Sequence, residues 1–382
     1  MARDGAGVTV CTVEGRADLK RFLDVPFAIY RYDPNWVAPL YAERLRHLDR
    51  RRNPYFQHAE AAFFLAERNG VAVGRISAQL DRLHLDRHKD GAGQFGFLEA
   101  IDDRSVFAAL LESAAAWLVK RGASRMRGPF SLSINDETGL LVDGFDRPPA
   151  VMMGHARPYY GPHLEALGFT KAKDMIAYDY DAAPPLPQLM AAMVERALKR
   201  GELEMRPLSK RHLDRDLAII MDIFNDAWAG NWGFVPLTQA EIGSLGQTLK
   251  SLVSEDYVAI ASWRGEPAAM AISLPDINRA IHDLNGRLMP LGWAKLLWRL
   301  FARPPAAVRL PLMGVRKIYQ RSAIGSALAL AVIARIRDSH LKRGVSQAEL
   351  SWILEDNLAM RRIIEGLGAV AYKTYRVYER AL

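Results

Sequence analysis

The sequence predicts a mixed α/β protein built as two tandem units, each with a central mixed β-sheet flanked by helices. Repeated patterns predict this fold class. Segments 61–81 and 257–276 each place two apolar, partly alternating runs around a turn glycine, as β-hairpins do. Segments 105–122 and 324–344 are Ala/Leu-rich helical patterns that end in glycine. One set of strands and helices therefore occurs twice along the chain.

The predicted elements follow the same order in both units. After the hairpin and the long helix comes a strand, at 124–133 in the first unit and at 347–353 in the second. A short helix then ends at a Leu-Gly pair, and a last strand carries Tyr178 in the first unit and Tyr378 in the second. Strands that alternate with helices in this way are typical of a sheet covered by helices.

A proline-rich, non-periodic stretch at 181–189 separates the two halves. We place the domain boundary there, with an N-terminal domain at 1–182 and a C-terminal domain at 183–382. The alternative is one large irregular domain. A chain of 382 residues exceeds one ordinary hydrophobic core, which favours two domains.

The composition is that of a soluble globular protein, with 50% hydrophobic and 25% charged residues. The single cysteine, Cys11, excludes an internal disulfide framework and favours a reducing compartment. The first residues lack the apolar core of a signal peptide, and the longest apolar run, near 326–336, is far shorter than a membrane span. We therefore expect a cytoplasmic protein.

The net charge of +8 indicates attraction to polyanions without identifying which one. The basic residues are scattered, and no helix-turn-helix, zinc-finger or RNA-binding signature is present, so we expect no specific nucleic-acid partner. No spacing of His, Cys, Asp and Glu indicates a metal site.

Residues 318–328 place a turn of small residues directly before a helix. Gln320, Ala323 and Gly325 fall within this turn. Small residues allow the backbone to approach a ligand, and the first turn of a helix offers unpaired N–H groups to an anion. The pattern therefore predicts a phosphate site.

The stretch at 310–333 resembles the cofactor segment of the GNAT superfamily of N-acyltransferases. It has a strand that ends at Val315, a Gln/Arg-x-x-Gly/Ala-x-Gly/Ala loop matched by Gln320, Ala323 and Gly325, and a helix. The resemblance implies a tandem GNAT fold in which this loop binds the pyrophosphate of acyl-CoA, the co-substrate, while the strand edge holds the pantetheine arm. The residues implied to bind the cofactor are Gly314, Val315, Gln320, Arg321, Ala323, Ile324, Gly325, Ser326 and Asn357.

The first unit departs from this pattern, because Asp102 and Asp103 stand where the loop should be. Their carboxylates would repel a pyrophosphate, so we expect the first unit to frame the substrate cleft without binding CoA. The second unit also departs from the family, since Ile364 occupies the position of the tyrosine that many members use as a general acid. The acid is therefore not assigned by the resemblance.

The sequence shows no cysteine paired with a histidine that could form an acyl-enzyme. We therefore expect direct transfer in a ternary complex. The candidate catalytic residues are Glu355, Glu137, Asn135, Tyr378 and His155. Four of them have a structural alternative: a solvated first-turn position for Glu355, a turn-forming or capping role for Asn135, sheet packing for Tyr378, and an ordinary loop position for His155.

Aromatic and amide side chains gather at 224–237, and such a group suits a substrate channel. The candidate substrate-binding residues are Trp228, Asn231, Trp232 and Phe234. Core packing of the rings is the alternative interpretation.

An insert at 286–305 has no counterpart in the first half and reads as an amphipathic helix. One predicted face carries Trp293, Leu296, Leu297, Leu300 and Phe301, and another carries Lys295, Arg299 and Arg303. This pattern, over 288–303, predicts a peripheral contact with the anionic inner membrane surface. The alternatives are an ordinary packed helix or a lid.

Motifs at 134–153 and 225–238 resemble the bacterial GNAT-type group that includes ceramide synthase. The resemblance implies transfer of a fatty acyl group from acyl-CoA to the amine of a sphingoid base, giving a (dihydro)ceramide. The alternatives are a Fem-like aminoacyltransferase, which takes its acyl group from charged tRNA, and a non-catalytic acyl-CoA sensor or scaffold.

Overall fold

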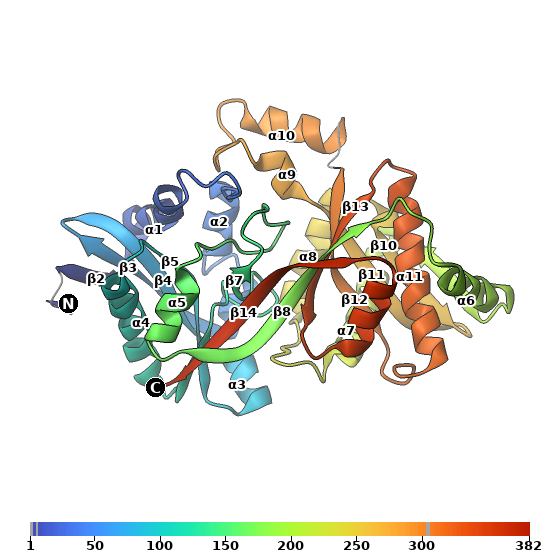
Figure 1. The fold of residues 1–382 in the computed structure, drawn as a ribbon, viewed down its shortest axis with the longest axis horizontal. Helices are drawn as coiled ribbons and strands as arrows, with labels where there is room; N and C mark the ends of the chain where they lie inside the picture. Colours follow the sequence, from blue (N-terminus) through green and yellow to red (C-terminus); the bar gives the residue numbers. More distant parts are fainter. Residues whose placement is uncertain (1–2, 5–6, 303–305) are drawn as a thin grey trace. The chain divides into compact units, whose positions relative to one another are not determined.

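A computed structural model of the chain describes residues 3–4, 7–302 and 306–382. The chain divides into two compact units (Figure 1). Unit 1 comprises Met1–Met175, Ile281–Trp293 and Lys373–Leu382, and unit 2 comprises Ile176–Ala280 and Ala294–Tyr372. The mixed α/β fold class predicted from the repeated patterns is confirmed. The boundary at 182/183 stays a prediction about domain organisation.

The sheet of unit 1 has the strand order β1-β2-β3-β4-β5-β6-β14, with β7 paired to β14. The pairs are antiparallel except for β5 with β6. The strands are β1 (Arg3–Asp4), β2 (Val8–Thr12), β3 (Ala59–Arg68), β4 (Val71–Asp81), β5 (Ala92–Ala100), β6 (Arg125–Gly128), β7 (Leu140–Asp143) and the end of β14 (Val370–Ala381). The strand expected at 124–133 is shorter than predicted, because β6 ends at Gly128.

Helices of unit 1 pack on this sheet through apolar side chains. Phe22 of α1 contacts the rings of Phe63 on β3 and Phe97 on β5, with ring centroids 5.4 Å and 6.0 Å away. The helices are α1 (Gly15–Ile29), α2 (Tyr41–His47), α3 (Arg82–His88), α4 (Arg104–Val119) and α5 (Tyr160–Ala166).

The sheet of unit 2 has the order β8-β13-β12-β11-β10-β9. β12 and β13 are parallel, and the β12–β11, β11–β10 and β10–β9 pairs are antiparallel. The strands are β8 (Thr170–Asp181), β9 (Leu203–Pro207), β10 (Val258–Trp263), β11 (Glu266–Pro275), β12 (Ala307–Val315) and β13 (Gln347–Leu354). β8 and β14 each contribute residues to both units.

Both predicted hairpins are confirmed as β3–β4 and β10–β11. Their turn residues all have positive φ: Asn69 and Gly70 in the first hairpin, and Arg264 and Gly265 in the second. Two successive residues with positive φ form the turn whose twist matches that of paired strands. Asn-Gly and Arg-Gly therefore set the register of these hairpins.

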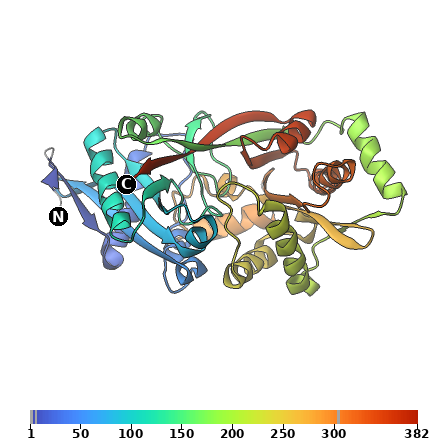
Figure 2. The same ribbon diagram turned by 90° about the horizontal axis from the view of Figure 1, so that it is seen from below.

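Helices cover both faces of the unit 2 sheet, with α7 and α8 on one side of the β10–β11 hairpin and α11 on the other (Figure 2). Alternate residues of β11 point to opposite faces of the sheet. Met270 and Ile272 pack in the core with α7, and Ala269 and Ala271 pack with α11. The helices are α6 (Gln188–Lys199), α7 (Leu213–Trp228), α8 (Gln239–Leu252), α9 (Ile277–Ile281), α10 (Gly292–Phe301), α11 (Ala323–Leu341) and α12 (Leu358–Gly366).

The predicted insert helix forms as α10, but its cations are not all arranged as expected. Arg299 donates a hydrogen bond to the carbonyl oxygen of Ala280 at 2.6 Å and is partly buried, so the expectation of a free cationic face is wrong for this residue. The exposed surface of α10 instead carries Trp293, Leu297 and Trp298, which are 49%, 46% and 55% exposed. Arg303 lies outside the described residues.

A buried histidine joins α11 to the β10–β11 hairpin. The hydroxyl of Ser273 donates to the carbonyl oxygen of Tyr257 and lies 2.8 Å from Nε2 of His340, so Nε2 carries the proton and donates to that hydroxyl. Nδ1 of His340 is buried with no hydrogen-bond partner among the described residues. Burial lowers the pKa of His340 to about 4, because protonation would place an unpaired N–H in the core.

Acid should destabilise unit 2 through His340. Its pKa falls from 6.5 in the unfolded chain to about 4 on folding, which corresponds to roughly 3 kcal/mol of folding free energy that is present above pH 6.5 and lost as the pH falls to 4. In His340→Leu, the loss of stability between pH 7.5 and pH 5 in urea denaturation should shrink by about 2 kcal/mol. The exposed His212 provides the control, His212→Gln. An unchanged acid loss in His340→Leu would contradict this assignment.

Candidate active site

The first turn of α11 offers main-chain N–H groups to an anion. Ser322 caps the helix: its hydroxyl accepts the N–H of Gly325 at 3.1 Å and donates to the carbonyl oxygen of Tyr319 at 2.5 Å. Within the described residues, no hydrogen bond is assigned to the N–H groups of Ala323 and Ile324. Ala323 is exposed. These two N–H groups and the positive end of the helix dipole suit a phosphate.

Gly325 is required by the loop's own backbone. A Cβ atom at this position would lie 2.2 Å from the carbonyl oxygen of Tyr319 and 2.9 Å from its carbonyl carbon. Arg321, in the same loop, has a φ of 61°, which places it in the left-handed region. The glycine therefore allows the loop to fold tightly under the helix start.

Polar contacts anchor this loop to α7 and to the end of β12. The side-chain amide of Gln320 donates to the carbonyl oxygens of Val315 at 2.8 Å and Ala227 at 3.3 Å. The N–H of Lys317 donates to the carboxylate of Asp226 at 2.7 Å. Gln320 therefore holds the loop through its side-chain amide.

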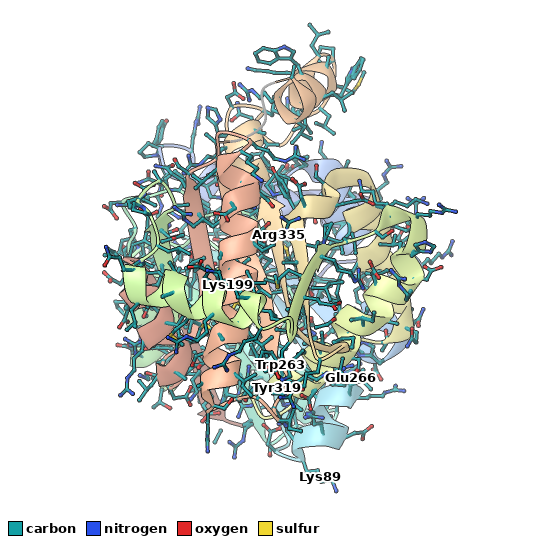
Figure 3. The ribbon with its side chains drawn as sticks, turned by 90° about the vertical axis from the view of Figure 1, so that its right-hand side faces the viewer. Lys89, Lys199, Trp263, Glu266, Tyr319 and Arg335 are labelled. Atoms are coloured by element: carbon teal, nitrogen blue, oxygen red, sulfur yellow. The ribbon has the colours of Figure 1, made fainter. Side chains whose placement is uncertain are left out.

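Tyr319 and Trp263 lie close together near the start of α11 (Figure 3), and both pack in the core under this helix. Lys317 and Arg321 are exposed beside the loop. Cationic side chains at this place complement the charges of a diphosphate.

The strand that leads into the loop has an open edge. β12 and β13 pair in parallel only from Ala307 with Gln347 to Leu310 with Leu350. In the described part of the chain, residues 312–315 pair with β11 and no bridge joins them to β13. The carbonyl oxygens of Met313 and Val315 accept from the side chains of Trp228 and Gln320, at 2.9 Å and 2.8 Å. The edge is otherwise one to which an extended chain can add by main-chain hydrogen bonds.

Gly314 on this strand contacts α7. A Cβ atom there would lie 3.2 Å from Cβ of Ala227 and 3.5 Å from Cγ2 of Ile223. The side of Gly314 that faces α7 is therefore filled by the helix, and only its main-chain groups remain for a ligand.

Of the four predicted substrate-binding residues, Trp228 contacts this edge directly. Its indole N–H donates to the carbonyl oxygen of Met313 at 2.9 Å, and its ring lies 5.9 Å from that of Trp352 on β13. Asn231 and Trp232 follow in the next turn and are partly buried. Phe234 is 4% exposed and packs in the core of α7 and α8.

Asn357 and Glu355 follow the end of β13. Asn357 is exposed and caps α12, because its side-chain oxygen accepts the N–H of Met360 at 3.3 Å. Glu355 is partly buried, and its carbonyl oxygen accepts a hydrogen bond from Arg361 at 3.0 Å. Both residues belong to unit 2, as does the loop before α11.

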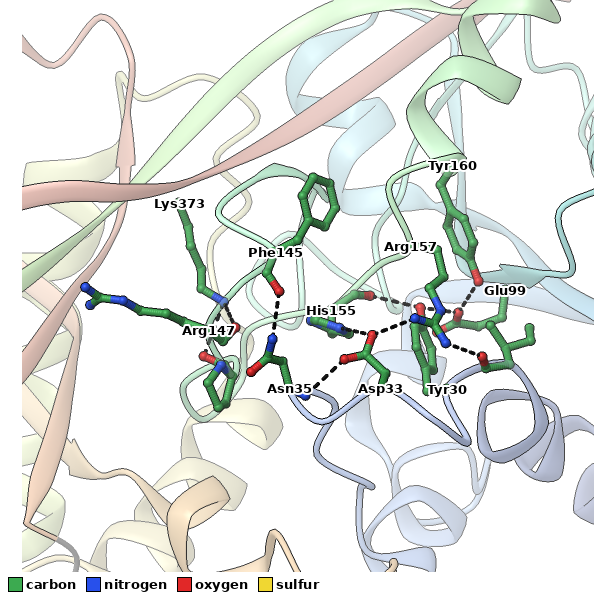
Figure 4. A network of polar contacts seen from close by, with 12 residues as sticks. Tyr30, Asp33, Asn35, Glu99, Phe145, Arg147, His155, Arg157, Tyr160 and Lys373 are labelled. Carbon is green, nitrogen blue, oxygen red and sulfur yellow. Dashed lines mark hydrogen bonds and ion pairs between the residues drawn. The ribbon is translucent and has the colours of Figure 1, made fainter.

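His155 belongs to a buried polar network of unit 1 (Figure 4). Its Nε2 atom lies 3.0 Å from the carboxylate of Asp33, which also accepts from Arg157 at 3.0 Å. Burial lowers the pKa of His155, and the bond with Asp33 offsets this only in part. The same network joins Tyr30 and Tyr160 to Glu99, with both phenols 2.7 Å from its carboxylate.

Glu137 and Asn135 lie in a loop of unit 1 whose polar groups bond to one another. Glu137 forms an ion pair with Arg44, and the N–H of Asn135 donates to the hydroxyl of Ser133 at 3.0 Å. Burial raises the pKa of Asp136, the residue between them. The loop is therefore held by an ion pair to α2 and by its own turn.

Tyr378 also belongs to unit 1 and is 1% exposed. Its hydroxyl donates to Glu165 at 2.9 Å. Burial, and then the bond with Glu165, raise the pKa of Tyr378 to about 12. Four of the predicted catalytic residues therefore belong to unit 1, whereas the loop before α11 belongs to unit 2. They are Tyr378, Glu137, Asn135 and His155.

The corresponding helix start in unit 1 is occupied by the chain's own carboxylate. Asp103 caps α4 by accepting the N–H of Ser105 at 2.8 Å, and it pairs with Arg68 at 2.7 Å. The hydrogen bonds from Ser105, and then that from Arg68, lower the pKa of Asp103 to about 2. Asp103 therefore holds a negative charge where unit 2 has Ser322.

One polar cluster in unit 2 was not predicted as a site. Glu349 on β13 is 6% exposed, and its two carboxylate oxygens accept from the hydroxyls of Tyr372 and Ser351. Arg309 on β12 is 3% exposed, donates to Ser351 at 2.9 Å and lies 3.7 Å from Glu349. The signal was present in the sequence, because Glu349 and Ser351 share one face of an otherwise apolar strand.

The described residues contain no group of three or more His, Cys, Asp and Glu that could hold a metal ion. None of the helices in the described ranges has the length and apolar character needed to cross a membrane.

Comparisons with known proteins reveal relatives along nearly the whole chain, although no family model matches it. Protein YghO of Escherichia coli K12 is 44% identical over 378 residues, which cover 98% of this chain and 95% of that protein. The bacterial ceramide synthase of Caulobacter vibrioides is 44% identical over 379 residues, which cover 99% of this chain and 98% of that protein.

Solved structures confirm the tandem GNAT fold. A tandem GNAT protein from the clavulanic acid biosynthesis pathway is 13% identical, covers 98% of both chains and has a TM-score of 0.57. A GCN5-related N-acetyltransferase from Sphaerobacter thermophilus is 12% identical, covers 98% of this chain and 96% of that chain, and has a TM-score of 0.53. The fold inferred from the loop at 310–333 is therefore confirmed.

Replacing Gly325 should damage the anion site without unfolding unit 2. In Gly325→Ala, the added Cβ meets the carbonyl oxygen of Tyr319, so the loop must open and the N–H groups of Ala323 and Ile324 lose their alignment. We expect CoA affinity, measured by calorimetry, to fall about tenfold or more. Gly243→Ala, at a helical glycine with nothing within 4 Å of its Cβ position, is the control. Equal affinities of Gly325→Ala and wild type would contradict this location of the site.

Proposed function

This chain belongs to the bacterial ceramide synthase family and is a GNAT acyltransferase, and on that premise we propose that it acylates the amine of a long-chain sphingoid base to give a (dihydro)ceramide. The acyl donor is acyl-CoA. The observation that carries the proposal is 44% identity over 99% of the chain to a bacterial ceramide synthase. The open edge of β12 and the helix start beside it support a donor site in unit 2.

The donor is proposed to bind along one continuous path in unit 2. Its diphosphate lies at the N–H groups of Ala323 and Ile324, with Lys317 and Arg321 nearby. Its pantetheine arm runs back along residues 315 to 312 by main-chain hydrogen bonds, as an added strand does. The thioester then lies near the point where β12 joins β13.

Direct attack by the amine is proposed, without an acyl-enzyme. Cys11 is the sole cysteine, and burial, followed by the nearby charge of Glu67, raises the pKa of its thiol. A thiol with a raised pKa is a poor nucleophile at neutral pH. Cys11 also lies on β2 of unit 1, whereas the α11 helix start belongs to unit 2.

The amine-acylation proposal predicts stoichiometric products. Purified protein incubated with long-chain acyl-CoA and sphinganine should release one free CoA thiol for each N-acyl product identified by mass spectrometry. Short-chain acyl-CoA and an unrelated primary amine are the controls for selectivity. Binding of CoA without thiol release for any amine would favour the sensor alternative. Acylation from aminoacyl-tRNA would favour the Fem-like alternative.

We also propose that α10 places the protein peripherally on the inner surface of an anionic membrane, where a lipid substrate resides. Two exposed tryptophans and a leucine on one short helix are typical of an interfacial contact, since indole rings lie at headgroup depth. Leu291 and Met289, just before the helix in sequence, are also exposed, at 72% and 74%. Lys295 is exposed on the same helix, and the net charge of +8 adds attraction to anionic headgroups.

Removing the tryptophans should weaken membrane binding. For Trp293→Ser/Trp298→Ser, we expect the partition coefficient onto phosphatidylglycerol-containing vesicles, measured by cosedimentation, to fall about tenfold or more. The matched control is Val71→Ser/Leu189→Ser, which removes exposed apolar side chains elsewhere. Unchanged vesicle binding by the tryptophan variant would contradict the membrane role of α10.

A further inference from the structure

We infer that Tyr372 and Glu349 together accept the proton that the substrate ammonium must lose before its nitrogen can attack the thioester. Tyr372 touches the amine and Glu349 takes the proton through it. The inference rests on the proposed function and assigns the base of that reaction. None of the residues singled out from the sequence as a catalytic candidate belongs to this pair.

The contacts of the pair form a connected chain of donors and acceptors. The phenol of Tyr372 donates to Oε2 of Glu349, and the hydroxyl of Ser351 donates to Oε1. Arg309 donates from Nε to the hydroxyl of Ser351 at 2.9 Å and from a terminal nitrogen to its carbonyl oxygen at 3.2 Å. Each carboxylate oxygen is therefore fixed by a hydroxyl, and a guanidinium 3.7 Å away compensates the charge.

Stability alone does not account for such a cluster. Arg309, Glu349 and Ser351 are each 6% exposed or less, so their polar groups have been removed from water. Well-packed apolar side chains of similar volume usually stabilise a sheet interior at least as well as a buried ion pair. Buried charged groups with hydrogen-bond partners are instead common where a reaction needs them.

The cluster lies at the base of the opening between two parallel strands. Arg309 and Glu349 are direct partners in the ladder, and the last pair, Leu310 with Leu350, comes immediately after them. Beyond that pair lies the open edge at 312–315. A donor whose arm follows this edge from the α11 helix start reaches the cluster within a few residues, at about 3.3 Å per residue.

The side chains also point toward the face on which an acceptor can approach. Arg309 pairs across the sheet with Leu274, which packs in the core on the α7 side. Trp228, at the end of α7, contacts both strands of the opening through Met313 and Trp352. Tyr372 is partly buried, so part of its side chain remains accessible. The acceptor amine is thus expected on the α7 face of the opening.

The ammonium gives one proton to the phenol oxygen of Tyr372 while the phenol proton moves to Oε2 of Glu349, which leaves a neutral amine and a neutral carboxyl group. The amine nitrogen then bonds to the thioester carbon, and the carbon–sulfur bond breaks. The second nitrogen proton ends on the CoA sulfur, and Glu349 returns its proton to water.

Two variants test the pair by the pH dependence of the rate. In Tyr372→Phe and Glu349→Gln, kcat at pH 7 should fall about 100-fold, in the range found for loss of general-base catalysis. The variant rates should then continue to rise about tenfold per pH unit as the free amine increases, while the wild-type rate levels off. CoA affinity measured by calorimetry should change less than threefold, since neither residue lies at the anion site.

Matched controls separate chemistry from folding. Tyr32→Phe and Glu195→Gln make the same changes at exposed positions, and their kcat values should equal that of wild type. Melting temperatures report whether Glu349→Gln folds without the carboxylate charge beside Arg309. If it does not fold, the kcat and pH profile of Tyr372→Phe, which retains the ion pair, test the inference.

The outcomes distinguish this inference from the function on which it rests. A wild-type protein that acylates no amine overturns the proposed function and the inference together. An active wild type with kcat in Tyr372→Phe within threefold, or reduced with an unchanged pH profile, overturns the inference alone. Loss of kcat together with the steeper pH dependence supports it.

Discussion

The parallel pairing of β12 with β13 ends at Leu310 with Leu350, and the features of the unit 2 site depend on that end point. Because two parallel strands need a crossover, α11 connects them and begins at the same end of the sheet where the ladder has opened. One constraint therefore brings three things together. They are a strand edge that no second strand pairs within the described residues, a helix start whose N–H groups of Ala323 and Ile324 have no assigned hydrogen bond there, and the buried pair of Arg309 and Glu349.

The equivalent helices of the two units, α11 and α4, have N-terminal caps of different charge. Unit 2 caps α11 with the neutral hydroxyl of Ser322, which leaves the positive end of the helix available to an outside anion. Unit 1 caps α4 with Asp103, whose charge is held by Ser105 and Arg68. A carboxylate already in place repels a second anion. One capping residue thus explains how a duplicated fold can carry a single donor site, with unit 1 holding its polar groups in the buried network around Glu99 and Asp33.

Much of this was readable from the sequence because the signals were local. Turn glycines marked both hairpins, and small residues before an Ala/Leu helix marked the loop at Gln320 to Gly325. What could not be read depends on contacts between distant segments. Gln320 and Gly314 are used for packing against α7, a helix far from them in sequence. Arg309, Glu349 and Tyr372 meet only because the register of three strands brings them together, and no single segment reveals that.

The central claim is that the start of α11 binds the diphosphate of the donor. A crystal structure of the protein with a non-hydrolysable long-chain acyl-CoA analogue tests it most directly. The account predicts diphosphate oxygens at about 3 Å from the nitrogens of Ala323 and Ile324, with the pantetheine arm hydrogen-bonded along residues 312–315. A diphosphate bound elsewhere, including at the start of α4, would contradict it.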